Sequence, residues 1–278
     1  MELKITTLIE NMPDAAGELM YEHGLSLYIE FHGKKILFDT GQSGDFLKNA
    51  GKLGKSMKDL DAIIISHGHY DHSGGVPALL EVLEEETPMY VGVNFFLKKY
   101  KLLSDGTYRY NGNPFEKELL PEGKVRLQQV SCEVSSLWED VLLFRGFERT
   151  SDFEALNPKF YVEKDGVLEL DAFGDEVALG LRTEKGLVLI VGCSHVGISN
   201  ILQSVSRWTG EPIYAVLGGT HLIEAEEERL EKTMDAFQAC GVKCVAVSHC
   251  TGEAGIAKAQ EVFGERFVLN NTGNVFEL

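Results

Sequence analysis

The stretch that decides the fold runs from Asp61 to Gly75 and reads DAIIISHGHYDHSGG. Its first part, DAIIIS, is a short apolar run rich in β-branched residues, which is typical of a buried strand. Three histidines and one aspartate follow within six residues: His67, His69, Asp71 and His72. The stretch therefore predicts a buried strand that ends in a group of metal-ligand side chains.

The spacing of these residues suits two metal ions. Side chains at i and i+2 of an extended stretch point the same way, so His67 and His69 can bind one ion together. Asp71 and His72 lie just beyond, before Gly74-Gly75, and can face a second ion. Neutral imidazole with one carboxylate suits zinc, and also manganese or iron. Two such ions can share a hydroxide and lower its pKa towards neutral.

Other chemistry-bearing residues also follow apolar runs. They are His195 after LVLIVGCS, His221 after AVLGGT, His249 after CVAVS, and Asp39 in ILFDTG. A lone histidine after a strand is more often a loop residue with one hydrogen bond. In open α/β sheets, however, ligands gather where the carboxyl ends of strands emerge. Several strand ends of this kind predict one multinuclear metal site.

The rest of the chain predicts an α/β domain over residues 1–278. In the first half we expect a hairpin of strands at 25–30 and 35–38, a helix over 76–86 and a strand over 89–93. The segment 94–156 carries turn signals and short alternating runs, and is interpreted as an insertion or small α+β subdomain. We then expect strands at 159–163, 167–170, 177–183, 186–191, 212–217, 243–247 and 266–269, and helices at 197–206, 224–239 and 253–263.

Composition limits the partners. The formal charge of −17 disfavours nucleic acid and anionic membrane surfaces. We find no apolar run of the roughly 18 residues that cross a bilayer and no signal-peptide core, so we expect a cytoplasmic protein. The five cysteines fit reduced thiols, and Cys240 with Cys244 is better explained as a buried pair than as a metal site. The oligomeric state stays open.

The run SHGHYDHSGG resembles the H-x-H-x-D-H signature of the metallo-β-lactamase superfamily. ILFDTG, GCSH and SHC resemble further motifs of the same family. The resemblance implies an αββα sandwich of two similar halves. It also implies that two divalent ions, with zinc favoured over manganese or iron, are bound by two sets of ligands. The first set is His67, His69 and His195; the second is Asp71, His72 and His249, with Asp39 orienting a ligand.

One position departs from the family pattern. Most members carry a bridging aspartate after the strand that here reads YAVLGGTHL, where Gly218 or Gly219 stands instead. Either His221 substitutes for the acid, or the two ions share only solvent. As a third alternative, His221 hydrogen-bonds the substrate.

A narrower resemblance involves GLSLYIE, GCSHVGISNIL, GGTHL and SHCTG. These stretches are similar to the subgroup that contains dihydropterin ribofuranosyl-aminobenzene phosphate synthase. Arg149 and Thr251 are candidates for contact with an anionic substrate, although a surface arginine and a plain helix N-cap are the simpler interpretations. His23 lies near the site by this resemblance, or serves a turn. Cys250 has no evident base and is a poor nucleophile.

We therefore expect a metal-dependent hydrolase or transferase that acts on a small anionic metabolite through a metal-bound hydroxide, with catalytic roles for Asp71 and His221. One alternative is a dihydropterin-type synthase that condenses a pterin with an aminobenzene ribose phosphate. A second is a non-enzymatic metal- or ligand-binding protein. A flavin-linked di-iron redox role is disfavoured, because those members replace the second histidine of the motif with an acid and this chain keeps His69.

Overall fold

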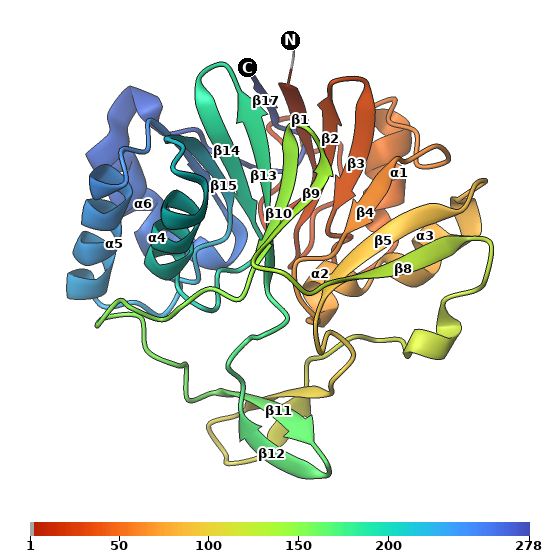
Figure 1. Cartoon of the computed structure of the whole chain (residues 1–278), viewed down its shortest axis with the longest axis horizontal. Helices are drawn as coiled ribbons and strands as arrows, with labels where there is room; N and C mark the ends of the chain where they lie inside the picture. Colours follow the sequence, from red (N-terminus) through yellow and green to blue (C-terminus); the bar gives the residue numbers. More distant parts are fainter. Residues whose placement is uncertain (1–2) are drawn as a thin grey trace. The chain divides into compact units, whose positions relative to one another are not determined.

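The computed structural model describes residues 3–278, which divide into two compact units. Unit 1 takes the chain up to Gln129, with Asn157–Asp175 and Asn271–Leu278; unit 2 is Val130–Leu156 with Glu176–Asn270. Each unit contains one large mixed sheet accompanied by helices, as Figure 1 shows. The expected α/β class is confirmed.

The large sheet of unit 1 has the strand order β17-β1-β2-β3-β4-β5-β8. The strands are β1 (Leu3–Ile9), β2 (Ser26–Phe31), β3 (Lys34–Phe38), β4 (Ala62–Ile64), β5 (Thr87–Gly92), β8 (Val125–Val130) and β17 (Val275–Glu277). β17, β1, β2 and β3 pair antiparallel, whereas β3, β4 and β5 run parallel. The parallel pairing brings the carboxyl ends of β3 and β4 to the same edge of the sheet.

Three helices accompany this sheet: α1 (Asp45–Lys52), α2 (Tyr70–Ser73) and α3 (Val76–Val82). Phe46 of α1 and Leu79 of α3 are fully buried in one core with Leu37 of β3 and Ile63 of β4. Burying each such side chain contributes roughly 1.5–3 kcal/mol. The core therefore anchors β3 and β4, and with them the loops that follow these strands.

A second sheet of unit 1 has the order β12-β11-β6-β7. Its strands are β6 (Lys99–Leu102), β7 (Tyr108–Tyr110), β11 (Phe160–Lys164) and β12 (Val167–Leu170), and a 3-10 helix, η1 (Lys117–Leu119), lies between β7 and β8. An isolated bridge joins Gly112, just after β7, to His69. This sheet therefore touches the histidine motif directly.

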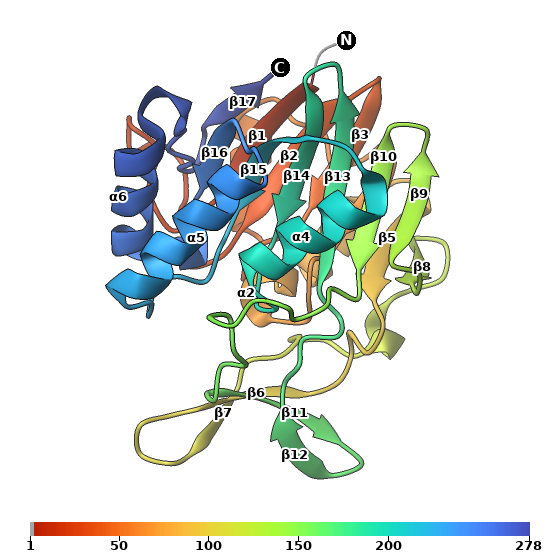
Figure 2. The same ribbon diagram turned by 60° about the vertical axis from the view of Figure 1, so that its left-hand side comes forward.

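Unit 2 has a six-stranded sheet in the order β16-β15-β14-β13-β10-β9. The strands are β9 (Val134–Trp138), β10 (Val141–Arg145), β13 (Val177–Thr183), β14 (Gly186–Val191), β15 (Ile213–Gly218) and β16 (Cys244–Val247). β14, β15 and β16 run parallel. The helices α4 (Ile198–Thr209), α5 (Glu227–Ala239) and α6 (Gly252–Phe263) cover one face of it, as Figures 1 and 2 show, and η2 (His249–Thr251) precedes α6.

The segment 94–156 contributes strands to three sheets: β6 and β7 to the small one, β8 to the large sheet of unit 1, and β9 and β10 to that of unit 2. That it is an insertion or a subdomain of its own stays a prediction. Among residues 3–278, no helix has the length and apolar character of a membrane span.

Two local predictions were wrong. The strand expected over 266–269 does not form: the 3-10 helix η3 (Gly264–Arg266) ends at its first residue, and only one bridge, from Phe267 to Val245, reaches the sheet. The helix expected over 76–86 ends at Val82, because Leu83 is already extended and buried in the core. The other predicted strands and helices of unit 2 are present with small shifts at their ends.

Candidate metal centre

Unit 1 presents its ligand-type side chains beyond the carboxyl ends of β3 and β4. Asp39 follows β3 directly, and Ile65-Ser66 lead from β4 into the histidine loop and the short helix α2. Each of these residues is at most 6% exposed: Asp39, His67, His69, Asp71 and His72. Buried polar groups need partners, so the hydrogen bonds of this cluster define its protonation.

Ser66 and Asp39 determine which ring nitrogens carry protons. The Ser66 hydroxyl donates to Asp39 Oδ2 at 2.8 Å, and His67 Nδ1 lies 2.9 Å from the same hydroxyl oxygen. A hydroxyl has only one proton, so Nδ1–H of His67 donates to Ser66 and Nε2 is the unprotonated nitrogen. His72 Nδ1 lies 2.7 Å from Asp39 Oδ2, which assigns the same tautomer to His72. Metal-binding histidines are commonly oriented in this way.

Burial keeps His67 neutral. The pKa of His67 lies well below its ordinary value, and burial is the largest cause of this shift. The neighbouring His72 and His69 lower the pKa further. A neutral imidazole is the form that binds a metal. The unprotonated Nε2 of His67 is therefore chemically ready for a cation.

His67 and His69 turn the relevant nitrogens toward each other. His67 Nε2 and His69 Nδ1 lie 3.1 Å apart. Two imidazole nitrogens that bind one tetrahedral zinc at 2.0–2.1 Å are about 3.3 Å apart. The separation therefore suits a shared metal ion as well as a direct hydrogen bond.

Asn111 is compatible with the metal-bound form. Its Nδ2 is placed 3.3 Å from His69 Nε2. Turned by half a rotation, the same amide places its oxygen there, where it accepts a proton from His69 Nε2. Then both facing nitrogens of His67 and His69 carry lone pairs, which only a cation between them stabilises. The donor set of unit 1 fits a divalent metal.

Asp71 and His72 form a second group of candidate ligands in unit 1. Asp71 Oδ2 lies 3.7 Å from His72 Nε2, the nitrogen that Asp39 leaves unprotonated. His23 Nε2 lies 3.2 Å from the same carboxylate oxygen, so His23 stands beside Asp71. A carboxylate and an imidazole at this separation can bind one ion.

A buried ion cluster supports the loop between the two histidines. Lys99 Nζ lies 2.6 Å from Asp171 Oδ2 and 2.8 Å from Asp175 Oδ1, and Lys99 is only 2% exposed. Asp175 Oδ2 in turn accepts the N–H of Gly68 at 2.8 Å. An added Cβ at Gly68 would lie 2.4 Å from the Phe95 carbonyl oxygen, so the loop is also closely packed.

Sequence reasoning missed this cluster, because its members are distant in the chain and belong to no motif. A lysine near the start of a strand is usually interpreted as a surface residue. The one sequence feature that could have indicated the cluster is the pair Asp171 and Asp175 in DAFGDE, just before the buried strand β13.

Unit 2 presents its ligand-type side chains beyond three parallel strands: Cys193 and His195 after β14, His221 after β15, and His249 after β16. Glu176 holds the first of these loops, since its two carboxylate oxygens accept the N–H groups of His195 and Val196, each at 2.8 Å. The rings of His195 and His221 are 4.4 Å apart between centroids. His221 therefore lies beside a predicted metal ligand.

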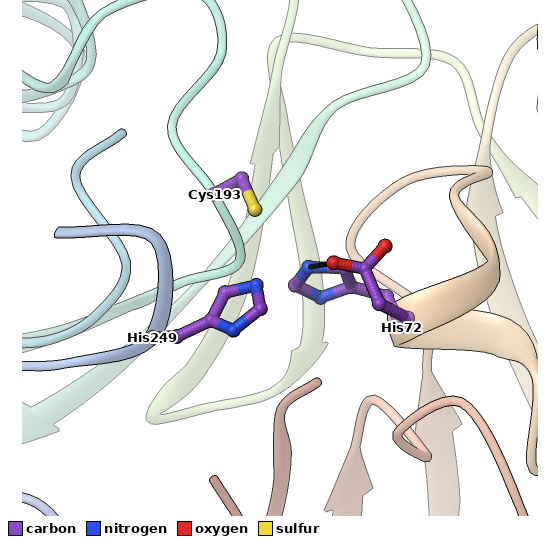
Figure 3. A group of neighbouring side chains, drawn as sticks. His72, Cys193 and His249 are labelled. Carbon is purple, nitrogen blue, oxygen red and sulfur yellow. Dashed lines mark ion pairs between the residues drawn. The ribbon is translucent and has the colours of Figure 1, made fainter. Parts of the chain in front are cut away.

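Cys193 and His249 form a second pair in unit 2. Both are 3% exposed, and Sγ of Cys193 lies within 4.8 Å of a ring nitrogen of His249. Figure 3 shows the thiol and the imidazole turned to the same side of their loops. The GCSH motif predicted only the histidine as a ligand, and Cys193 was missed.

The glycines that replace the bridging aspartate leave no room for a side chain. An added Cβ at Gly218, where φ is +117°, would lie 1.9 Å from the Val191 carbonyl oxygen. At Gly219 it would lie 2.5 Å from Cys250 Sγ. The close packing of β15 beside β14 therefore requires glycine where most family members have the acid.

Arg149 and Thr251 have protein partners in unit 2. The Arg149 guanidinium donates to the carbonyl oxygens of Val196 at 3.1 Å and His195 at 3.3 Å. Thr251 is the N-cap residue of α6 without a side-chain capping bond, and its buried hydroxyl accepts from the hydroxyl of Thr220 at 3.0 Å. Contact of either residue with a substrate stays a prediction.

Several of these strand ends have a left-handed backbone. The residues are Asp39 (φ 59°), Ser194 (57°), His221 (47°) and His249 (56°). Such conformations of non-glycine residues cost roughly 1–3 kcal/mol each and persist where the surrounding structure enforces them, often at functional sites. Their position beside the predicted ligands supports a functional interpretation of both sets of loops.

Comparison with known proteins agrees with the motifs. Residues 21–130 match the family model of the metallo-beta-lactamase superfamily. The chain is 32% identical to the 7,8-dihydropterin-6-methyl-4-(beta-D-ribofuranosyl)-aminobenzene-5'-phosphate synthase of Methanocaldococcus jannaschii. The alignment covers 95% of this chain and 92% of that protein. It is also 30% identical to protein MJ0448 of that organism, over 98% of each chain.

A solved structure is similar over the full length. Tm1679, described as a metal-dependent hydrolase of the beta-lactamase superfamily, superimposes with a TM-score of 0.86 at 32% identity, and the match covers 99% of each chain. The expected fold family and its resemblance to the synthase subgroup are thus confirmed. On this evidence the chain belongs to the metallo-β-lactamase superfamily.

Proposed function

We propose that the chain is a hydrolase or transferase that acts on a small anionic metabolite at a site for two divalent ions. The observation that carries the proposal is the buried pair of His67 Nε2 and His69 Nδ1, which lie 3.1 Å apart. Ser66 accepts a hydrogen bond from His67 and donates one to Asp39. Membership of the superfamily supports the full ligand assignment. The first ion is given to His67, His69 and His195, and the second to Asp71, His72 and His249.

Bound divalent ions would lower the pKa of a coordinated water and polarise a phosphoryl or acyl oxygen. The residues of the chain prepare that chemistry. Ser66 and Asp39 keep the protons of His67 and His72 on Nδ1. Asp71 and His221 are proposed to act at the reacting atoms, Asp71 beside His23 and His221 beside His195. His221 would stabilise negative charge that develops on the substrate.

The proposed substrate follows from charge. A chain of formal charge −17 offers little attraction for polyanions, whereas bound cations invert the field locally and can hold a small anion. We therefore propose a small anionic molecule rather than nucleic acid or a membrane surface. All five cysteines are thiols, which supports a reducing compartment such as the cytoplasm.

The 32% identity to the M. jannaschii synthase favours a second candidate function. In this alternative the same site serves the condensation of a pterin with an aminobenzene ribose phosphate. The two candidates share the metal ligands and differ in whether water or a second substrate attacks.

Metal analysis and a substrate panel test the proposal. Purified protein reconstituted with zinc or manganese should contain up to two ions per chain, and His69→Ala should contain fewer. His32→Ala, on the exposed hairpin turn, is the matched control and should keep both. Less than about 0.2 metal per chain after reconstitution would rule out the site.

The panel should contain phosphodiesters, lactones and phosphate esters, with the pterin and aminobenzene pair assayed in parallel. Turnover of an ester or lactone supports the hydrolase, and product formation only from the pair supports the synthase. Full metal content without turnover of any compound would favour a metal- or ligand-binding protein.

A further inference from the structure

We propose that Cys193 binds the second metal ion as a thiolate, in place of the bridging aspartate that the chain lacks, and that this ligand makes the site prefer zinc to manganese. The inference rests on the proposed two-metal site and adds a ligand to it. The carrying observation lies within unit 2, where Cys193 and His249 stand together beyond β14 and β16.

The geometry of the pair suits a shared ion. A thiolate at 2.3 Å and an imidazole nitrogen at 2.0–2.1 Å on one tetrahedral zinc lie about 3.6 Å apart. Sγ of Cys193 and a ring nitrogen of His249 lie within 4.8 Å of each other, both side chains are buried, and both face the same space in Figure 3. The separation that one shared ion requires therefore lies within the observed limit.

The packing of β15 explains why the ligand comes from β14. Gly218 and Gly219 occupy the position of the acid, and neither tolerates even a Cβ. A ligand in that place therefore cannot come from either glycine, and the end of a neighbouring strand can supply it. Cys193 follows the adjacent parallel strand β14 by two residues, and the left-handed backbone of Ser194 turns the chain immediately after it.

A second buried thiol in unit 2 provides a comparison. Cys250 follows His249 directly, but its Sγ accepts the N–H of His221 at 3.3 Å and lies 3.5 Å from the carbonyl oxygen of Cys193. It packs against Gly219 and does not join the group of ligand atoms around His249. Cys250 is therefore a matched control for a buried thiol close to the site.

The chemistry involves no redox change. The S–H bond of Cys193 breaks, a sulfur–metal bond forms, and the proton leaves to solvent. Thiolate is a soft ligand that suits zinc, whereas manganese prefers carboxylate, carbonyl and water oxygens. A thiolate in the second set thus selects between the metals that the histidines and Asp71 alone would accept.

Cobalt(II) tests the assignment independently of activity, because a cobalt–thiolate bond gives an intense near-ultraviolet charge-transfer band that nitrogen and oxygen ligands lack. The full chain is stripped of metal, titrated with cobalt(II), and followed by absorption and by elemental analysis. The wild type and Cys250→Ser should show the band as the second ion binds. Cys193→Ser should lack it and should bind the second ion at least about 10-fold more weakly.

The outcomes separate this inference from the proposed function. Two cobalt ions per chain without a charge-transfer band in the wild type would overturn the thiolate ligand and leave the two-metal site intact. Failure to bind cobalt at all would overturn both. If Cys193→Ser does not fold, the wild type loaded with cadmium tests the thiolate ligand by cadmium NMR. A cadmium signal without the downfield shift that sulfur ligands cause would refute the proposal.

Discussion

Replacing Lys99 by methionine should destabilise unit 1 and weaken metal binding together. Methionine keeps much of the apolar stem but removes the cation between Asp171 and Asp175, which lie 2.6 and 2.8 Å from Nζ. Removing one partner of a buried ion pair typically costs about 3–5 kcal/mol, because a buried charge is left uncompensated. We expect Lys99→Met to lower the free energy of unfolding by that amount.

The expected loss of metal affinity follows from the hydrogen bond of Gly68. Its N–H donates to Asp175 Oδ2, so a carboxylate that has lost its lysine no longer holds the loop between His67 and His69. Loss of a supporting contact of this kind typically costs about 10- to 100-fold in metal affinity. Denaturant unfolding and competition with a fluorescent chelator measure the two quantities. Lys98→Met, on the exposed neighbouring residue, should change unfolding by less than about 0.5 kcal/mol.

The pH dependence offers a further check. Burial lowers the pKa of Lys99, but Asp175 and Asp171 outweigh burial and leave it above its ordinary value of 10.5. A raised lysine pKa contributes stability that is present below the unfolded value and is lost as pH rises through the folded value. The stability gap between wild type and Lys99→Met should therefore be retained at neutral pH and shrink above about pH 10.5. A gap below about 1 kcal/mol at neutral pH would refute the role of the cluster.

Three other predictions concern the site and its surroundings. His221→Ala should lower activity at least about 10-fold while the melting temperature changes little, and His32→Ala should leave activity intact; a fully active, fully loaded His221→Ala would contradict the assignment. Gly218→Ala should lower the free energy of unfolding by at least about 2 kcal/mol, because the added Cβ meets the Val191 carbonyl at a positive φ; Gly210→Ala, at φ +67° with open space around it, should cost only about 1–2 kcal/mol. DNA and RNA should show no measurable binding at physiological salt, and salt-sensitive micromolar binding in a filter or fluorescence assay would contradict the charge argument.

The parts of the structure that the sequence predicts well are those with a strong local pattern. Val177–Thr183 and Gly186–Val191 form β13 and β14 at the predicted bounds, because continuous apolar runs between turns leave few alternatives. The histidine motif likewise places its side chains at the end of β4, since the buried strand and the loop after it are adjacent in the chain.

Features that depend on distant contacts were not predictable. β17 pairs with β1 across almost the whole chain, and no local pattern marks a three-residue strand. The strand expected over 266–269 has a suitable local pattern, but its residues meet the sheet only at the bridge between Phe267 and Val245, directly after η3. In the site, Lys99 and Cys193 were overlooked because their roles arise only when separate segments meet.

The hydroxyl of Ser66 makes one hydrogen-bonded hub for residues assigned to both metal ions. It donates to Asp39, accepts from His67 at 2.9 Å and lies 3.4 Å from His72 Nδ1. An ion on His67 would polarise that ring and strengthen its hydrogen bond to Ser66. The change would reach Asp39, the carboxylate that accepts from both Ser66 and His72. Binding coupling is reciprocal: if the first ion changes the affinity for the second by some factor, the second changes the affinity for the first by the same factor. Occupancy of the two proposed positions would then be a linked equilibrium, adjusted by a single serine that is assigned to neither ion.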